Sequence, residues 1–265
     1  MISVSNIGTG VGSSSQRAAG GAPSFAIQRS IYFDGVNDLA SNGSLTTNGF
    51  QPFNNKDWTV TFWAKSDGTR YKDLGTVMAV AIANNSGNAF MWVRFKNDGT
   101  TDSTINVRTN VKNYTSGHTI TSAKCQIWQH YAVVVTQNSG TAKQDIEIYV
   151  NGTSVDTGSV DQSTRTNTNV DVCLGSSNNT TAHQAYKGYL AEIGCWETAL
   201  TSGQIAAIYG GGSGADLSTI GTVKGYYKPL TTDGPTTGSI TDSSGNQDCT
   251  MNNFVSPYGV VTDTP

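Results

Sequence analysis

The sequence predicts an all-β fold, a sandwich of antiparallel strands, from three observations. From residue 29 onward, short apolar or alternating segments follow one another, separated by Gly, Asn and Ser turn signals. Only one segment has the pattern of a helix, and one short helix among about ten or more strands is typical of an antiparallel sandwich. Hydrophobic residues make up 36% of the 265 residues, and 30 glycines accompany them, so a sizeable core can form.

The expected strands follow in order along the chain. They cover residues 29–35, 58–66, 76–84, 89–97, 104–110, 130–138, 145–150, 169–177 and 187–199. In the segment 145–150, the alternation places Ile146, Ile148 and Val150 on the inner face. Asn151 and Gly152 follow directly and predict a type I′ hairpin turn, because both residues tolerate positive φ.

The single helix is expected near residue 201. Thr201 can cap its N-terminus, with Gln204 at the capping-box position. Ile205, Ile208 and Tyr209 share one face. The glycines 210–212 end the helix.

The composition argues against electrostatic partners. Charged residues are 13% of the chain, the formal net charge is -3, and no Lys/Arg cluster occurs, so nucleic acid binding is not expected. A surface of Asn, Thr, Ser and Gly suits packed assemblies or glycan contacts. The N-terminal segment has no basic and apolar regions of a signal peptide, and no apolar run approaches the ~18 residues of a membrane span, so we expect neither.

The four cysteines show no metal-binding pattern. Cys125, Cys173, Cys195 and Cys249 have no C-x-x-C spacing, which gives zinc no support. Buried free thiols are the preferred interpretation because no secretion signal is visible, with disulfides as the alternative.

The chain is expected to form an arm, residues 1–28, followed by one sandwich over residues 29–265. The arm is rich in Gly, Ser and Ala and cannot bury enough apolar area to fold alone. It is either a flexible terminus or a strap that becomes ordered against a neighbouring subunit.

Five segments in order resemble a known family. They are "IYFDGVNDLA", "WTVTFWAKSDG", "WQHYAVVVTQ" followed by "IEIYVNGTSV", "LGSS", and "YKGYLAEIGCWETALTSGQIAAIY". Together, over about residues 30–209, they resemble the laminin-G-like branch of the concanavalin A-type lectin/glucanase superfamily. This resemblance implies a concanavalin A-like jelly roll.

The C-terminal segment "YYKPLTTDGPTTGSITDSSGNQDCTMNNF" resembles the first strand of that family, although here it follows the helix. A sandwich without its first strand leaves an unpaired edge. We therefore expect residues 223–256 to supply a returning strand beside the one that starts near Ile31, with Tyr226, Tyr227 and Leu230 packed in the same sandwich. The alternative is that the segment completes the sheet of the next subunit.

This arrangement is similar to laminin-G-like proteins of tailed bacteriophages. The resemblance implies a virion surface component, such as a capsid decoration, knob, fibre or tail part, assembled in the bacterial cytoplasm. Expected partners are other virion proteins, further copies of the chain and host polysaccharide, with no insertion into a membrane.

Enzyme activity is not expected. Asp145 and Glu147 alternate along one strand as glucanase carboxylates do, but Tyr149 stands at the third acidic position. These acids are better interpreted as the solvated face of a strand. His130 lies within a hydrophobic strand, and no Gly-x-Ser-x-Gly elbow occurs. A glycoside hydrolase remains a distant alternative.

Calcium is the one cofactor that the resemblance implies. Two sets of oxygen ligands are candidates: Asp34, Asn37 and Asp38 in the first, and Asp242, Asn246 and Asp248 in the second. The alternative interpretation, which we prefer, is turn chemistry, because Asp and Asn cap turns.

Glycan binding requires an aromatic platform near a rim or on the concave sheet. Most of the tryptophans, Trp58, Trp63, Trp92, Trp128 and Trp196, lie within or beside strands and are expected in the core. Tyr71, Tyr114 and Tyr186 are expected in loops and are the candidates. The resemblance thus implies a non-enzymatic virion protein, to which lectin-like adhesion to host glycans can be added, with a stand-alone lectin module as the alternative.

Overall fold

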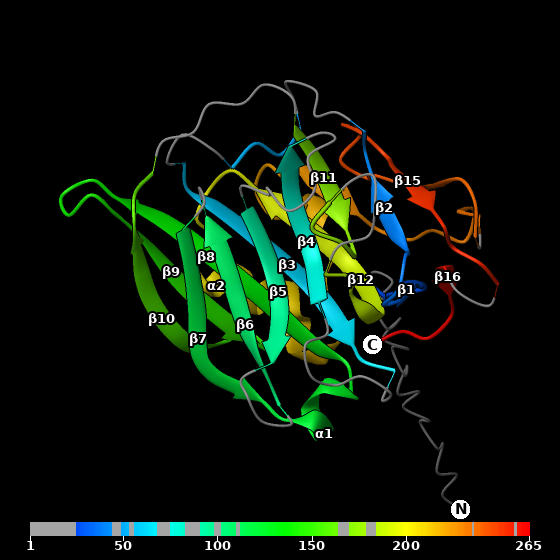
Figure 1. Cartoon of the computed structure of the whole chain (residues 1–265), viewed down its shortest axis with the longest axis horizontal. Helices are drawn as coiled ribbons and strands as arrows, with labels where there is room; N and C mark the ends of the chain where they lie inside the picture. The colour runs from blue at the N-terminus through cyan, green and yellow to red at the C-terminus, as the bar shows by residue number, and fades with distance from the viewer. Residues whose placement is uncertain are drawn as a thin grey trace, which may run out of the picture.

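The structure is a computed structural model that describes residues 25–43, 49–52, 56–67, 75–82, 91–97, 102–109, 112–163, 170–178, 184–234, 236–256 and 259–265. Two antiparallel sheets pack face to face (Figure 1), and within the described residues each has eight strands. The predicted all-β sandwich is confirmed. Residues 1–24 of the expected arm lie outside the described residues.

The first sheet, called sheet A, has the order β10-β9-β8-β3-β12-β1-β16, with β13 also paired to β12. Its strands are β1 (Ser30–Asp34), β3 (Trp58–Lys65), β8 (Gln129–Asn138), β9 (Lys143–Val150), β10 (Thr153–Asp161), β12 (Lys187–Trp196), β13 (Gly225–Tyr227) and β16 (Gly259–Val261).

The second sheet, called sheet B, has the order β14-β15-β2-β11-β4-β5-β6-β7. Its strands are β2 (Leu39–Ser41), β4 (Gly75–Ile82), β5 (Met91–Asn97), β6 (Ser103–Thr109), β7 (Lys112–Ile120), β11 (Val170–Leu174), β14 (Ser239–Ile240) and β15 (Cys249–Asn252).

The main core fills the space between the sheets. Ile146 and Ile148 of β9 face this core as the alternation predicts. Phe62 of sheet A stacks on Tyr131 at 5.5 Å and meets Phe95 of sheet B at 6.2 Å. The hairpin between β9 and β10 has positive φ at both Asn151 (50°) and Gly152 (75°), as a type I′ turn requires.

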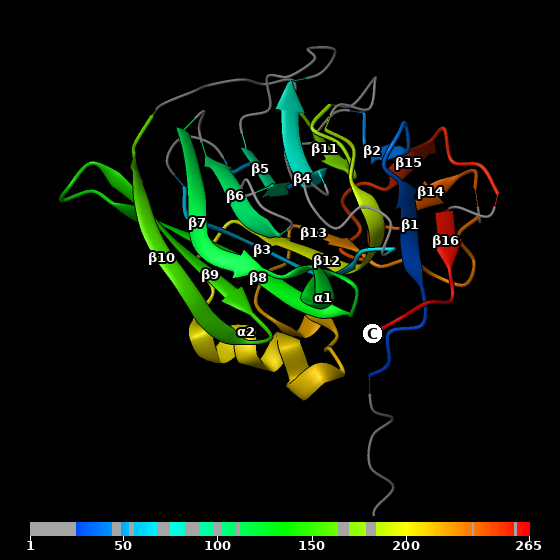
Figure 2. The same ribbon diagram turned by 60° about the horizontal axis from the view of Figure 1, so that its bottom comes forward.

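A second apolar layer covers the outer face of sheet A. Helix α2 (Ser202–Tyr209) lies outside the sandwich against this sheet (Figure 2). Thr201 and Gln204 form the predicted capping box, and Gly210 ends the helix in the left-handed conformation. Ile205 and Ile208 are buried together with outward-facing strand residues and with the 3₁₀ turn η2 (Leu217–Thr219). Two further short helical turns are α1 (Ser122–Cys125) and η1 (Gly210–Gly212).

The C-terminal segment pairs with strands from the start of the domain. β15 pairs with β2, and β16 pairs with β1, so red and blue strands lie side by side in Figure 1. The prediction that β13 lies beside β1 was wrong. β13 pairs with the second half of β12, at Ile193–Cys195, whereas β1 pairs with the first half of β12. A ten-residue strand thus accommodates two short strands along one side. Tyr226 and Tyr227 are buried, while Leu230 is half-buried.

The chain packs against sheet A from Phe25 onward, before the expected boundary at residue 28. Ile27 is buried against Trp63 and Ala191, and Phe25 and Tyr209 adjoin them. All four cysteines are buried, and none of them forms a disulfide bond. No helix in the described part of the chain has the length and apolarity that crossing a bilayer requires.

Candidate binding site at the rim of sheet A

The first expected calcium set forms a hydrogen-bonded turn. Oδ1 of Asp34 accepts hydrogen bonds from the backbone N–H groups of Val36 (2.7 Å) and Asn37 (3.1 Å). Oδ2 of Asp38 accepts from the N–H of Asp34 at 2.9 Å. Burial raises the pKa of Asp38 to about 7, and the charge of Asp34 adds to the increase. This is the turn chemistry of the alternative interpretation, and calcium binding there stays a prediction.

The second set organises the entry to β13. Asp242 Oδ1 accepts hydrogen bonds from the N–H groups of Tyr226 and Ser244, both at 2.9 Å, and Oδ2 accepts from the N–H of Gln247 at 3.0 Å. Asp248 in turn accepts from the N–H of Asp242 at 2.8 Å. Asn246 donates to the carbonyl of Lys224 at 3.0 Å. The carboxylates of Asp242 and Asp248 thus accept hydrogen bonds from backbone N–H groups. Among the described residues, no group of three or more His, Cys, Asp or Glu side chains is arranged to hold a metal.

Two of the three expected glycan tyrosines are described, and Tyr114 and Tyr186 do not form a shared surface platform. Tyr71 lies outside the described residues. The side chain of Tyr114 packs on β10: its hydroxyl donates to Asp156 Oδ2 at 2.8 Å, and a Cβ at Gly158 would lie 2.0 Å from its ring. The expectation of an accessible ring at Tyr186 was wrong, because this residue is fully buried in the main core.

Asp145 and Glu147 line an open hollow of about 410 Å³ on the outer face of β9. Asp145 is exposed and accepts a hydrogen bond from Asn138 at 2.9 Å. The Glu147 carboxylate accepts a hydrogen bond from the Tyr149 hydroxyl. Burial, together with this hydrogen bond and the charge of Glu147, raises the pKa of Tyr149 to about 12. Tyr149 is buried beneath the outer apolar layer, so the third position of the glucanase pattern carries neither an acid nor an accessible side chain.

A row of four side chains crosses the outer face of sheet A near one end. The register places Tyr32 of β1 beside Tyr189 of β12, and Tyr189 beside Lys65 of β3. Ala64 pairs with Gln129, so Trp128, which directly precedes β8, continues the row next to Lys65. We call these residues, Tyr32, Tyr189, Lys65 and Trp128, the rim row.

The rings of the rim row contact one another and the lysine between them. The Tyr32 and Tyr189 ring centroids are 4.7 Å apart, and those of Trp128 and Tyr189 are 6.2 Å apart, both edge to face. The Lys65 ammonium lies 4.8 Å from the Tyr189 centroid and 5.5 Å from the Trp128 centroid. Such cation–π contacts restrict a side chain that is otherwise flexible. The row is therefore an ordered surface.

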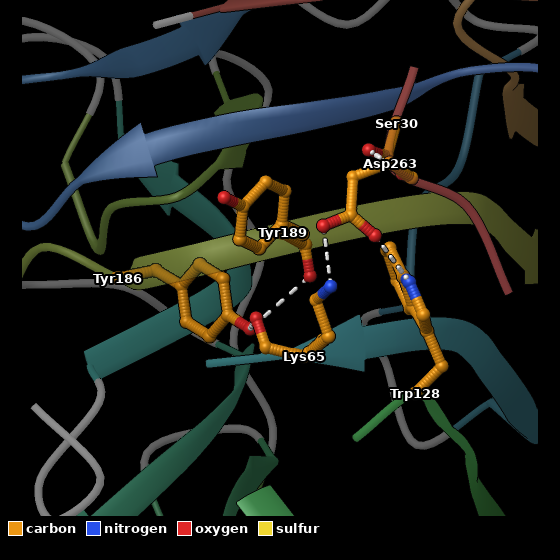
Figure 3. Close-up of polar contacts among 6 residues, drawn as sticks. All are labelled: Ser30, Lys65, Trp128, Tyr186, Tyr189 and Asp263. Atoms are coloured by element: carbon orange, nitrogen blue, oxygen red, sulfur yellow. Dashed lines mark hydrogen bonds and ion pairs between the residues drawn. The ribbon is translucent and has the colours of Figure 1, made fainter. Parts of the chain in front are cut away.

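A buried tyrosine supports the row from below. The hydroxyl of Tyr186 lies 3.4 Å from the carbonyl oxygen of Lys65 and 3.3 Å from that of Tyr189, and it donates toward both (Figure 3). The side chain that was expected to be a surface platform thus holds the backbone of two rim residues.

The C-terminal tail reaches the rim row after β16. The indole N–H of Trp128 donates to Asp263 Oδ1 at 2.9 Å, and the Lys65 ammonium pairs with Oδ2 of the same carboxylate (Figure 3). The Ser30 hydroxyl donates to the carbonyl of Asp263 and ties the tail to β1. Burial raises the pKa of the Tyr189 hydroxyl, and the negative charges of Asp263 and Asp67 raise it further.

A small hollow of about 170 Å³ opens beside Lys65. Its lining comprises Lys65, Ser66, Asp67, Gln126 and Tyr189. Asp67 accepts a hydrogen bond from the Tyr32 hydroxyl at 2.6 Å and lies 3.5 Å from the ammonium of Lys187. Gln126 is exposed, and so is 49% of the neighbouring Ile127. Aromatic faces, an amide, a carboxylate and an ammonium thus meet at one rim.

The sequence did not single out this rim. Trp58, Trp63, Trp92 and Trp196 are buried as expected, but Trp128 is half-buried and takes part in the surface. Its place just before a strand was a weak local signal. The partners Tyr189 and Asp263 come from distant segments, and only the pairing of β12, β3 and β16 brings them together.

The fold is that of a lectin-like β-sandwich. Residues 39–206 match the family of concanavalin A-like lectin/glucanases, so the chain belongs to that superfamily. No curated protein matches the chain. A proposed carbohydrate-binding protein from Bacteroides ovatus ATCC 8483 is similar in structure, with a TM-score of 0.59, 19% identity, and coverage of 91% of this chain and 62% of that one. The heptameric SAP-like pentraxin of Limulus polyphemus has a TM-score of 0.50 and 17% identity, and the match covers 69% of this chain and 82% of the pentraxin.

Proposed function

We propose that the protein is a non-catalytic saccharide-binding module and that the rim row is its binding surface. The observation that carries this proposal is the row itself: two half-buried rings, Tyr189 and Trp128, flank an ordered lysine and adjoin a hollow with amide and carboxylate groups. Ring faces pack against the C–H faces of sugars, and planar polar groups pair with hydroxyls. The membership of the lectin/glucanase superfamily agrees with this function.

A binding role is preferred over hydrolysis because both acids in the described part of the rim, Asp67 and Asp263, are engaged by cations and hydrogen-bond donors. A retaining enzyme requires two carboxyl groups about 5–5.5 Å apart that flank the scissile bond. At the rim, Asp67 contacts Tyr32 and Lys187, and Asp263 contacts Lys65 and Trp128. Each carboxylate therefore has a cation or a donor as partner instead of a second acid.

We further propose that this module serves on the surface of a bacteriophage particle, as a capsid decoration, knob, fibre or tail component assembled in the host cytoplasm. The support is the resemblance of the rearranged C-terminal strand to phage proteins and a composition with only 13% charged residues. A surface of neutral polar groups suits contacts with other virion proteins and with further copies of the chain. Host polysaccharide would be the ligand of the rim.

A glycan array tests the binding function. We expect the wild-type protein to bind a subset of oligosaccharides, and Trp128→Ala and Tyr189→Ala to weaken this binding by about tenfold or more, because each removes a ring from the platform. Tyr114→Phe is the control, since Tyr114 lies on β7, the edge strand of sheet B, whereas the rim row lies on sheet A. Melting curves verify that the variants are folded. Equal binding by all four proteins would contradict the assignment of the rim.

Two measurements separate the remaining alternatives. Co-sedimentation with purified virions supports the particle role, whereas a protein found only outside particles supports the stand-alone lectin. Release of new reducing ends from a bound glycan, abolished by Asp145→Asn or Glu147→Gln, would support the glycoside hydrolase instead.

A further inference from the structure

We infer that the rim binds saccharides that bear a carboxylate, and that Asp263 of the C-terminal tail occupies the carboxylate position as an internal competitor. This inference rests on the proposed saccharide-binding function and names the chemical class of its ligand. It starts from one juxtaposition: a partly exposed tail carboxylate lies on a cation and an indole N–H that face it together. We call Lys65 and Trp128 the carboxylate seat.

The seat is built without the tail. Lys65 belongs to β3, Trp128 precedes β8, and Tyr189 belongs to β12, three segments that the main sheet positions. Tyr186 fixes the backbone of Lys65 and Tyr189 from the core. The rings of Trp128 and Tyr189 hold the ammonium between them. Removal of the tail therefore leaves the cation and the indole donor in place.

The seat has the chemistry that a carboxylate requires. The two carboxylate oxygens are recognised separately: Oδ1 by the indole N–H at 2.9 Å and Oδ2 by the ammonium. Hydrogen bonds to a charged group are stronger than neutral ones, so this pair distinguishes an acid from a hydroxyl. The hollow beside Lys65, with Gln126 and Tyr189 in its lining, gives the sugar ring of such a ligand a place next to its carboxylate.

The other charged groups near the carboxylate seat are compatible with an anionic ligand. Asp67 is the acid that would repel a ligand, and the ammonium of Lys187 at 3.5 Å partly offsets its charge. With Asp263 displaced, Asp67 is the one acid beside Lys65 and Lys187 among the described residues. Within this part of the chain the charges change from two acids and two bases to one acid and two bases, which favours an acidic ligand over a neutral one.

The tail is held weakly enough to be displaced. The Asp263 side chain is 39% exposed and that of Lys65 is 18% exposed, and ion pairs near the surface contribute little. Tethering raises the effective concentration of Asp263 at the seat, so the tail acts as a competitor that an external carboxylate must overcome. We expect its removal to strengthen the binding of acidic saccharides by about threefold to tenfold.

The experiment compares the binding of paired glycans by variants of the 265-residue chain. An array carries uronate- and sialate-terminated oligosaccharides next to their neutral parents, and it is probed with wild type, Asp263→Asn and Thr262→Ala. Thr262 is exposed and adjoins Asp263 in the tail, so it is the matched control. A fourth protein ends after Val261, which keeps β16 and removes the competitor completely. Titration calorimetry with the strongest acidic glycan and its neutral parent then gives the affinities.

We expect Asp263→Asn and the shortened chain to bind acidic glycans about threefold to tenfold more tightly than wild type does. Neutral parents and Thr262→Ala should show no change, and Lys65→Met should lose the preference for acids in either background. Unchanged acidic binding in both Asp263 variants, or an equal increase for neutral parents, overturns the inference. The saccharide function still stands in that case if Trp128→Ala weakens the binding of neutral glycans. Absence of binding to every glycan by every variant overturns both proposals.

Discussion

The hydroxyl of Tyr226 donates a hydrogen bond to the buried carboxylate of Glu192 and so joins the returning strand β13 to β12. Glu192 lies at the irregularity of β12, with φ of 47°, where the pairing with β3 shifts register between Ala191 and Gly194. The bulge directs a carboxylate into an apolar layer that the C-terminal segment then closes. A strand from the C-terminal segment thereby supplies a hydrogen-bond donor to a carboxylate that the sheet buries.

This arrangement predicts a pH dependence of stability. Burial raises the pKa of Glu192 to about 7; Tyr226 and Lys228 oppose this increase and Asp216 adds to it. Between pH 4.5 and 7 the folded state therefore binds more protons than the unfolded state, and stability falls as the pH rises through this range. Glu192→Gln should remove this contribution and be more stable than wild type at pH 8, by up to about 3 kcal/mol. Urea denaturation at pH 5 and pH 8 measures it, and an unchanged difference between the two pH values would contradict it.

The burial of His130 predicts a pH dependence of stability with the opposite sign. Its ring is fully buried, 5.4 Å from Trp63 and 6.1 Å from Tyr209 between centroids, and burial lowers its pKa to about 3. The unfolded state binds the proton below about pH 6.5, so this histidine costs stability progressively as the pH falls from 6.5 toward 3. His130→Phe should flatten the acid limb of a melting-temperature profile. Asp38 and Glu192 titrate nearby in pH, so the comparison is made in the Glu192→Gln background with Asp38 present in both proteins.

Gly158 predicts a steric coupling across the two sheets. An added Cβ would lie 2.0 Å from the ring of Tyr114, which is itself fixed by Asp156. Gly158→Ala should therefore destabilise the fold by about 1–3 kcal/mol. In the Tyr114→Ala background the same substitution should cost much less, because the clashing ring is gone. Additive free energies in this double-mutant cycle would show that the two residues do not meet.

Tyr227 predicts that the C-terminal strand belongs to the main core. Its side chain is 2% exposed and lies in the cluster between the two sheets. Tyr227→Ala should lower the free energy of unfolding by about 3 kcal/mol or more, the usual loss for a buried aromatic residue. Val255→Ala, in the same segment but 58% exposed, is the matched control. Equal stability of the two variants would place Tyr227 outside the core.

Local patterns predicted what local chemistry determines. The capping box at Thr201, the hairpin at Asn151 and the inward side of β9 are each set by residues within one turn or strand, and all three are confirmed. The neighbour of β13 and the place of Tyr186 were wrong. Both depend on which strands pair, and a run of alternating residues carries no information about its partner.

The rim row likewise could not be predicted from local sequence patterns. Tyr32, Tyr189, Lys65 and Trp128 lie far apart in the sequence, and each taken alone has the pattern of an ordinary strand residue. Their common feature, a shared level across β1, β12 and β3 and the start of β8, exists only once the register is known. Asp263 reaches the rim row because the preceding strand β16 pairs with β1. No local pattern in the sequence indicated that pairing.

Acrylamide quenching of tryptophan fluorescence tests the central claim, saccharide binding at the rim row, most directly. Four of the five tryptophans are buried and Trp128 is half-buried, so one accessible component should dominate the quenching and disappear in Trp128→Phe. A saccharide that binds at the rim should protect this component in the wild-type protein. A saccharide that binds with measurable affinity yet leaves the quenching of Trp128 unchanged would contradict the account.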